Sequence, residues 1–128
     1  FVDRALGRYD VAAALTAAGM LVEVHDSHFA QDVDDHVWLD LCAARGWIAL
    51  TKDDRIRYDE LAKGVLLRSS IAVFTLKDQH MLGAAMGALF ATMRPKMERV
   101  YRKIGTGFIA YITRSGKIGR ILGPEDLK

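Results

Sequence analysis

Carboxylates follow several apolar segments of this sequence. Asp3 comes after the first apolar pair, Asp26 after "MLVEVH", and Asp53 and Asp54 after "WIALT". A further acidic cluster comprises Asp32, Asp34 and Asp35. Carboxylates held close together repel one another unless they are protonated, hydrogen-bonded or bridged by a cation. Mg²⁺ or Mn²⁺ with oxygen ligands is the simplest such cation, and it can activate water and stabilise a phosphate under attack.

Apolar segments of two lengths alternate along the chain and predict the elements that must position these acids. Short runs rich in β-branched residues indicate strands, and longer segments with apolar residues at helical spacing indicate helices. The expected strands are the pair ahead of Asp3, residues 20–26, 47–51 and 70–76, and a hairpin over 108–122 around Ser115-Gly116. The expected helices are 8–19, 34–46, 57–69 and one from Gln79 that kinks or restarts at Pro95.

Strands and helices that alternate in this way imply βαβ units around a mainly parallel sheet. We therefore expect an α/β fold with one domain over residues 1–128 and a C-terminal hairpin. Open sheets of this kind bind ligands outside the carboxyl ends of their strands. Because Asp3, Asp26 and Asp53 each follow a strand, and residues 32–35 open a helix on the same side, all these acids are expected at one edge.

Each acid also has a structural interpretation. The acids at 34–35 are favourable N-caps, and those at 53–54 would cap a helix that begins at Arg55. Capping does not account for Asp3, which leaves a core strand shortly ahead of a glycine. The convergence of all these groups on one edge therefore favours a functional site, with capping as a compatible second role.

The net charge of +2 hides an asymmetry between the two halves of the chain. Residues 1–60 carry twelve acidic and six basic side chains, whereas residues 61–128 carry four acidic and twelve basic ones. A basic surface attracts polyanions, although an ordinary solvated surface also explains either half alone. The single Cys42 excludes an internal disulfide and a cysteine-rich zinc site.

No apolar run approaches the ~20 residues of a membrane span, and we expect no signal peptide ahead of the first strand. These features indicate a cytoplasmic protein without membrane association. Gly83 and Gly87 form a GxxxG pattern, which favours close helix packing on the sheet over a dimer interface. Whether two chains pair as a homodimer stays open.

The sequence resembles the PIN-like nucleases, in particular the compact branch that includes VapC-type toxins of toxin–antitoxin systems. The matching pieces are "FVDR", "HDSHFAQDVDDHVWL" and "RGWIALTKDDRIRY", and the resemblance covers almost the whole chain. It implies a three-layer α/β/α sandwich around a mainly parallel sheet. It also implies a metal-dependent endoribonuclease that acts on RNA and is held inactive by a cognate antitoxin.

The resemblance implies the site residues as well. The family's first-strand acid corresponds to Asp3, the acid that opens the middle helix to Asp35, and the acid after "TK" to Asp53. These three are expected to be catalytic and to hold Mg²⁺ or Mn²⁺. Further candidate metal ligands are Asp26, Asp32 and Asp54, and the candidates for a fourth family acid are Asp78 and Asp54.

Basic residues near these acids are expected to hold RNA phosphates. The group beside the third-strand acid is Lys52, Arg55 and Arg57, and the later basic stretch is Arg94, Lys96, Arg99, Arg102 and Lys103. Two alternatives stay open. One is a PIN-like scaffold that binds RNA or a partner without catalysis. The other is a phosphoacceptor receiver domain, which would need a pair of acids at the first strand, where Asp3 stands alone.

Overall fold

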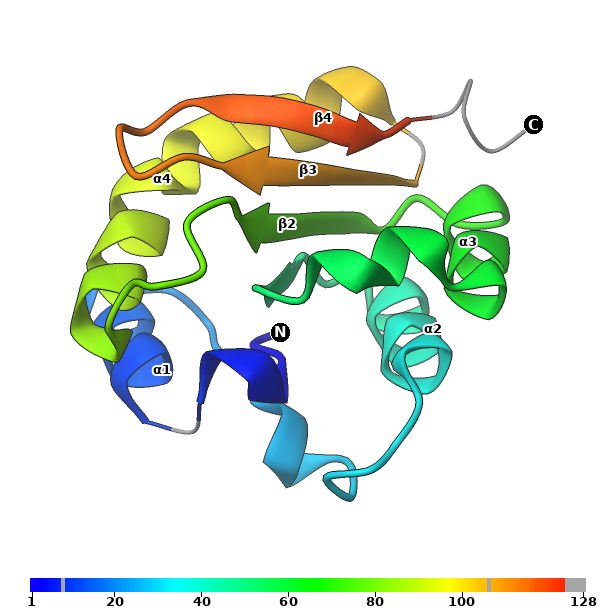
Figure 1. Cartoon of the computed structure of the whole chain (residues 1–128), viewed down its shortest axis with the longest axis horizontal. Helices are drawn as coiled ribbons and strands as arrows, with labels where there is room; N and C mark the ends of the chain where they lie inside the picture. Colours follow the sequence, from blue (N-terminus) through cyan, green and yellow to red (C-terminus); the bar gives the residue numbers. More distant parts are fainter. Residues whose placement is uncertain (8, 106, 124–128) are drawn as a thin grey trace.

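A four-stranded sheet in the order β1-β2-β3-β4 forms the centre of the protein (Figure 1). The structure is a computed structural model that describes residues 1–7, 9–105 and 107–123, without the side chain of residue 54. β1 (Ala49–Thr51), β2 (Ala72–Leu76) and β3 (Phe108–Ile112) are parallel, and β4 (Ile118–Leu122) is antiparallel to β3. The predicted α/β fold with a mainly parallel sheet and a C-terminal hairpin is therefore confirmed.

The first residues of the chain extend this sheet beside β1. Val2 forms isolated parallel bridges with Leu50 on one side and with Val24 on the other. The predicted strand over 20–26 is therefore wrong except at Val24, because the bridge between Val24 and Val2 is the only strand pairing of this segment in the described residues. Pairing cannot continue past Asp3, since the chain turns there into the 3₁₀ helix η1 (Arg4–Leu6).

Helices cover both faces of the sheet. The helices α1 (Asp10–Ala17) and α4 (Gly83–Ile104) contribute to one core cluster, and α2 (Asp35–Arg45) and α3 (Glu60–Leu67) contribute to the other. Successive residues of a strand point to opposite faces. The central strand follows this rule, because its alternate side chains belong to different clusters. Two buried cores on opposite faces are what a three-layer arrangement requires.

The segment that follows β1 is helical in two pieces rather than one. The 3₁₀ helix η3 (Asp54–Tyr58) comes first, and α3 begins only at Glu60. Asp59 starts α3, because its Oδ1 accepts hydrogen bonds from the backbone N–H groups of Leu61 (3.0 Å) and Ala62 (3.2 Å). The single helix predicted over 57–69 is corrected accordingly.

α4 is one continuous helix that contains Pro95, and its axis changes direction along its course (Figure 1). A bend is expected, because proline lacks the N–H for the helical hydrogen bond and crowds the preceding turn. The glycines of the GxxxG pattern pack against α1 rather than the sheet. A Cβ at Gly87 would lie 2.6 Å from the Ala14 Cβ, and one at Gly83 would lie 2.6 Å from Asp10 Oδ2.

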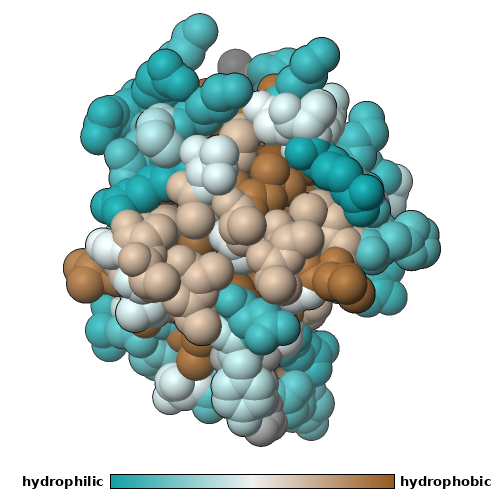
Figure 2. All heavy atoms as spheres, turned by 90° about the vertical axis from the view of Figure 1, so that its left-hand side faces the viewer, coloured by the Kyte–Doolittle hydropathy of each residue, from teal (hydrophilic) through white to brown (hydrophobic). Residues whose placement is uncertain are grey.

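The outer side of α1 and of the first half of α4 is largely apolar (Figure 2). Exposed alanines occur on both helices, and Leu82 is 79% exposed at the start of α4. Within α4, residues 83–93 carry no charged side chain. Among the described residues, no helix combines the length and hydropathy needed to span a membrane.

Candidate active site at the carboxyl edge of the sheet

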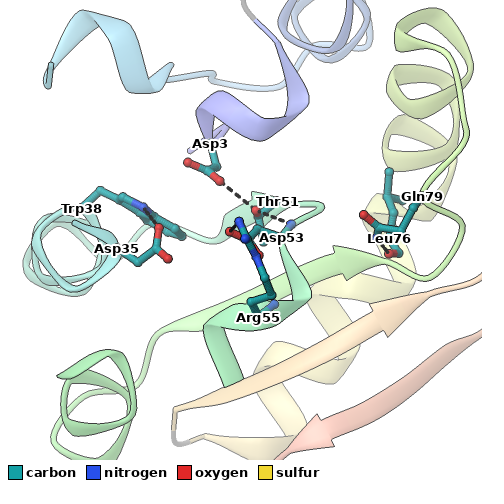
Figure 3. Close-up of polar contacts among 8 residues, drawn as sticks. All are labelled: Asp3, Asp35, Trp38, Thr51, Asp53, Arg55, Leu76 and Gln79. Atoms are coloured by element: carbon teal, nitrogen blue, oxygen red, sulfur yellow. Dashed lines mark hydrogen bonds and ion pairs between the residues drawn. The ribbon is translucent and has the colours of Figure 1, made fainter. Parts of the chain in front are cut away.

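Three carboxylates from distant parts of the chain face one region beside the carboxyl end of β1 (Figure 3). Asp3 ends the N-terminal extended segment, Asp35 is the first residue of α2, and Asp53 lies two residues beyond β1. Burial is the main cause of the raised pKa of Asp3 and of Asp35, and the acids also influence one another, because Asp35 raises the pKa of Asp3 and Asp53 raises that of Asp35. The structure thus brings together the three acids expected to be catalytic.

Asp3 is a buried carboxylate with both oxygens hydrogen-bonded. Its Oδ1 accepts from the Arg4 backbone N–H (2.8 Å), and its Oδ2 accepts from the Thr51 hydroxyl (2.8 Å). Burial raises the pKa of Asp3, while the Thr51 hydrogen bond opposes that rise. The expectation that capping does not explain Asp3 was wrong, since Asp3 is the N-cap of η1.

Thr51 joins two of the acids. This fully buried residue ends β1, and its hydroxyl donates to Asp3 while accepting from the Asp53 backbone N–H (3.0 Å). The Thr51 hydroxyl therefore fixes the side chain of Asp3 and the backbone of Asp53. The sequence analysis missed this residue, although a threonine directly ahead of "KDD" at a strand end was its signal.

Asp35 is half-buried and accepts a hydrogen bond from the indole Nε1 of the buried Trp38 at 2.9 Å (Figure 3). Burial is the main cause of its raised pKa, the Trp38 hydrogen bond lowers it, and the nearby Asp53 and Asp59 raise it further. Asp34 occupies the N-cap position of α2, but its side chain makes no capping hydrogen bond. The role of Asp34 as a cap is therefore not confirmed.

Asp53 differs from the other two acids because a guanidinium group balances its charge. Arg55 donates from Nε to Oδ1 (3.0 Å) and from Nη2 to Oδ2 (3.2 Å), and its backbone N–H also donates to Oδ1. These interactions lower the pKa of Asp53. The predicted capping role is confirmed, since Asp53 is the N-cap of η3. The guanidinium occupies both oxygens of this carboxylate.

The chemistry of these residues fits a hard divalent cation, because all three offer carboxylate oxygens, and the pKa values of two are raised by burial and, to a smaller extent, by a neighbouring acid. The geometry does not yet close around an ion. Over the described part of the chain, no three His, Cys, Asp or Glu side chains are grouped closely enough to hold a metal. Binding of an ion to Asp53 would require Arg55 to leave that carboxylate.

The other acidic candidates lie around this centre. Asp26, in the 3₁₀ helix η2 (His25–Ser27), accepts from the Gln31 side chain and lines a small pocket of about 200 Å³ with Arg4. Asp32 is exposed in the following loop. Asp78 forms a 2.7 Å ion pair with Arg114. The side chain of Asp54 lies outside the described residues.

Three basic residues follow β1 in the chain, and one of them, Arg55, pairs with an acid of the site. Arg55 is 84% exposed despite its pair with Asp53. Arg57 stacks over the Tyr58 ring with 4.8 Å between its Cζ and the ring centroid. Lys52, which lies between Thr51 and Asp53 in the sequence, is half-buried. The position of Arg55 at the acids therefore agrees with the sequence analysis, whereas the roles of Lys52 and Arg57 stay predictions.

The basic residues of α4 extend over a longer distance. Lys96 still reaches the carboxyl edge, because its Nζ donates to the Gly116 carbonyl (3.0 Å) in the β3–β4 turn. Lys96 and Arg99 line an open groove with Lys117. Arg94 pairs with Glu98, and Arg102 lies near the same carboxylate. Because α4 returns to the start of β3, Arg102 and Lys103 lie toward the opposite edge of the sheet.

Comparisons with known proteins give consistent results. A family described as "PIN like domain" matches residues 1–78. The chain is also 31% identical over 126 residues to "Putative ribonuclease VapC45" of Mycobacterium tuberculosis (strain ATCC 25618 / H37Rv), an alignment that covers 95% of this chain and 90% of the relative. No solved structure matches the chain significantly.

Proposed function

The chain belongs to the PIN-like domain family, and on that premise we propose that it is a metal-dependent endoribonuclease, the toxin of a VapBC-type toxin–antitoxin pair. The proposal is supported by the relative named as a ribonuclease, which aligns with nearly the whole chain. The observation that carries it is the meeting of Asp3, Asp35 and Asp53 at one sheet edge. Substrate RNA and an antitoxin protein are the partners that this function requires.

We assign the binding of Mg²⁺ or Mn²⁺ to Asp3, Asp35 and Asp53. When bound, such an ion activates water and stabilises the negative charge that develops on a phosphodiester. Thr51 orients Asp3 through its hydroxyl, and Trp38 orients Asp35 through its indole N–H. Lys52, Arg55 and Arg57 hold the phosphates next to the bond that is cleaved, and the α4 cations nearest this edge hold a more distant part of the strand.

The antitoxin is proposed to cover the acidic edge. A protein that inserts an arginine or an amphipathic helix there would neutralise the carboxylates and block RNA access at the same time. A structure of the complex tests this, and an interface that avoids both Asp3 and Asp53 would contradict it.

The nuclease proposal is tested by incubating purified protein with labelled structured RNA in Mn²⁺, Mg²⁺ or EDTA. Asp53→Asn keeps the size of the side chain and removes its charge, so we expect it to lose cleavage. Asp40→Asn is the matched control, because Asp40 is an exposed residue of α2 whose partner is Arg68. We expect Asp40→Asn to cleave RNA at the wild-type rate. We expect EDTA to stop cleavage by the wild type and by Asp40→Asn.

A catalytically silent RNA-binding scaffold is the second candidate. It is favoured by the Arg55–Asp53 pair, which leaves the carboxylates without a closed metal geometry. RNA binding without cleavage in either metal would support the scaffold hypothesis and contradict the nuclease hypothesis. Cleavage that persists in Asp53→Asn would show that the assigned site is wrong.

A further inference from the structure

Lys77 and Tyr111 form a contact at the carboxyl edge that the assigned site does not use. Lys77 directly follows β2, and its ammonium lies 4.5 Å from the centroid of the Tyr111 ring on β3. Its backbone N–H donates to the Ile112 carbonyl (3.0 Å), so the chain is still attached to the sheet at this residue. The cation is therefore anchored both by its backbone and by its aromatic neighbour.

Gly119 on β4 makes room for this arrangement. Gly119 is paired in register with Tyr111, and a Cβ at this position would lie 2.2 Å from ring Cζ and 2.3 Å from the hydroxyl oxygen. The tyrosine ring thus lies over the glycine, where any other residue would displace it. The same ring contacts the ammonium of Lys77, which restricts an otherwise flexible side chain.

This pair lies on the same face of the sheet as the acids. Thr51, Thr75 and Tyr111 are register partners across β1, β2 and β3. Because side chains alternate along a strand, this row points away from the cluster that contains Leu50 and Phe74, and toward α2. Asp35 begins α2 on that face, and Thr51 binds Asp3. The ammonium of Lys77 therefore lies at the next strand end from the carboxylates.

The charge of Lys77 is available for a ligand. Its side chain is exposed and forms no ion pair with a described carboxylate, whereas the neighbouring Arg114 is neutralised by Asp78. An RNA strand that enters the acidic centre meets repulsion from the carboxylates of Asp3 and Asp35, which pair with no cation among the described residues. A fixed cation one strand away offsets that repulsion for the flanking phosphate.

We propose that Lys77, held on the Tyr111 ring above Gly119, is a binding site for a backbone phosphate of single-stranded RNA next to the bond that is cleaved. The proposal rests on the proposed function for its substrate class. Lys77 acts by direct contact with the phosphate, and Tyr111 is a positioning residue that acts through Lys77.

The test measures binding of a fluorescent single-stranded RNA in EDTA at several salt concentrations. Each phosphate contact contributes about 0.7 to the slope of log affinity against log salt for single strands. We expect Lys77→Gln to weaken binding and to reduce that slope by about 0.7. Arg68→Gln removes the same charge at the opposite edge, beside the start of β2, and is expected to leave affinity and slope unchanged.

Two further variants examine the role of the ring. Tyr111→Leu and Gly119→Ala both keep the lysine but disturb its support, so each is expected to weaken RNA binding in the wild-type background. In the Lys77→Gln background neither is expected to add a further loss, because the three residues act as one unit. Urea unfolding of every variant identifies any that fail to fold, and binding is compared among the folded ones.

The proposal is overturned if Lys77→Gln and Arg68→Gln change the slope equally, if the Tyr111→Leu loss is fully additive, or if the wild type does not bind RNA. Failure of the proposed function looks different. In that case the wild type does not cleave RNA in Mn²⁺ or Mg²⁺, while Lys77→Gln still lowers the slope of binding in EDTA.

Discussion

The carboxylates of Asp3, Asp35 and Asp53 share one edge but differ in how their charge is balanced. Asp53 has a guanidinium on both oxygens, Asp3 has two neutral donors, and Asp35 has the indole N–H of Trp38. Burial raises the pKa of Asp3 and of Asp35, and Arg55 lowers that of Asp53. The metal-free protein therefore carries an electrostatic cost at this site that a bound cation would relieve.

The cost at Asp35 predicts a dependence of stability on pH. A carboxyl whose pKa is raised by folding binds more protons in the native state. The free energy of unfolding therefore falls as the pH rises above 3.8, the ordinary pKa of an aspartate. We expect Asp35→Asn in EDTA to be more stable than the wild type at pH 7, with the difference disappearing below pH ~3.8. The Asn oxygen can still accept from Trp38. Urea unfolding from pH 3 to 8 measures this, and an equal or lower stability of Asp35→Asn at neutral pH would contradict it.

At the scale of elements, the close approach of α4 to α1 decides how one face of the sheet is covered. The two helices make contact through Gly87, where a side chain would meet the Ala14 Cβ and the α1 backbone near Asp10 and Val11. Glycine in a helix interior costs about 0.5–1 kcal/mol relative to alanine. The contact that Gly87 allows therefore offsets a local preference for alanine.

A pair of glycine substitutions separates packing from helix propensity. Gly87→Ala is expected to destabilise the protein by about 1–3 kcal/mol, because the new methyl group forces the helices apart. Gly64→Ala in α3 is the matched control, since its Cβ would meet only the flexible Arg68 Nη1 at 3.2 Å. It is expected to stabilise by about 0.5–1 kcal/mol. Chemical denaturation measures both, and a stabilised Gly87→Ala would show that α1 and α4 are loosely packed.

On the scale of the whole molecule, charge and apolar surface are separated. The acids gather at the carboxyl edge, cations flank them, and the outer side of α1 and α4 is apolar (Figure 2). A polyanion such as RNA is attracted to the cations that flank the acids and not to the uncharged helices. An apolar surface of this kind suits contact with a protein.

A cation that binds only the folded protein must raise its global stability. For one site, an ion at 100 times its dissociation constant stabilises by about 2.7 kcal/mol. We expect Mn²⁺ to raise the unfolding temperature of the wild type and of Asp40→Asn, and EDTA to reverse the rise. Asp53→Asn should show a much smaller shift. Differential scanning fluorimetry measures the unfolding temperatures. An equal rise in all three proteins would place the ion outside the proposed site.

The resemblance to the PIN-like nucleases singled out Asp3, Asp35 and Asp53 among the acids, and their roles stay predictions. Local pattern in the sequence was sufficient to predict the parallel sheet, the hairpin at Gly116, where φ is 87°, and the gathering of acids at one edge. Those features follow from periodicity, turn chemistry and the rule that parallel strands end at one edge. Only the tertiary structure decided that Thr51 joins the acids, that Arg55 covers Asp53, and that Lys77 rests on Tyr111. These contacts depend on side-chain geometry and on packing between elements, such as the space at Gly119, which no local pattern encodes.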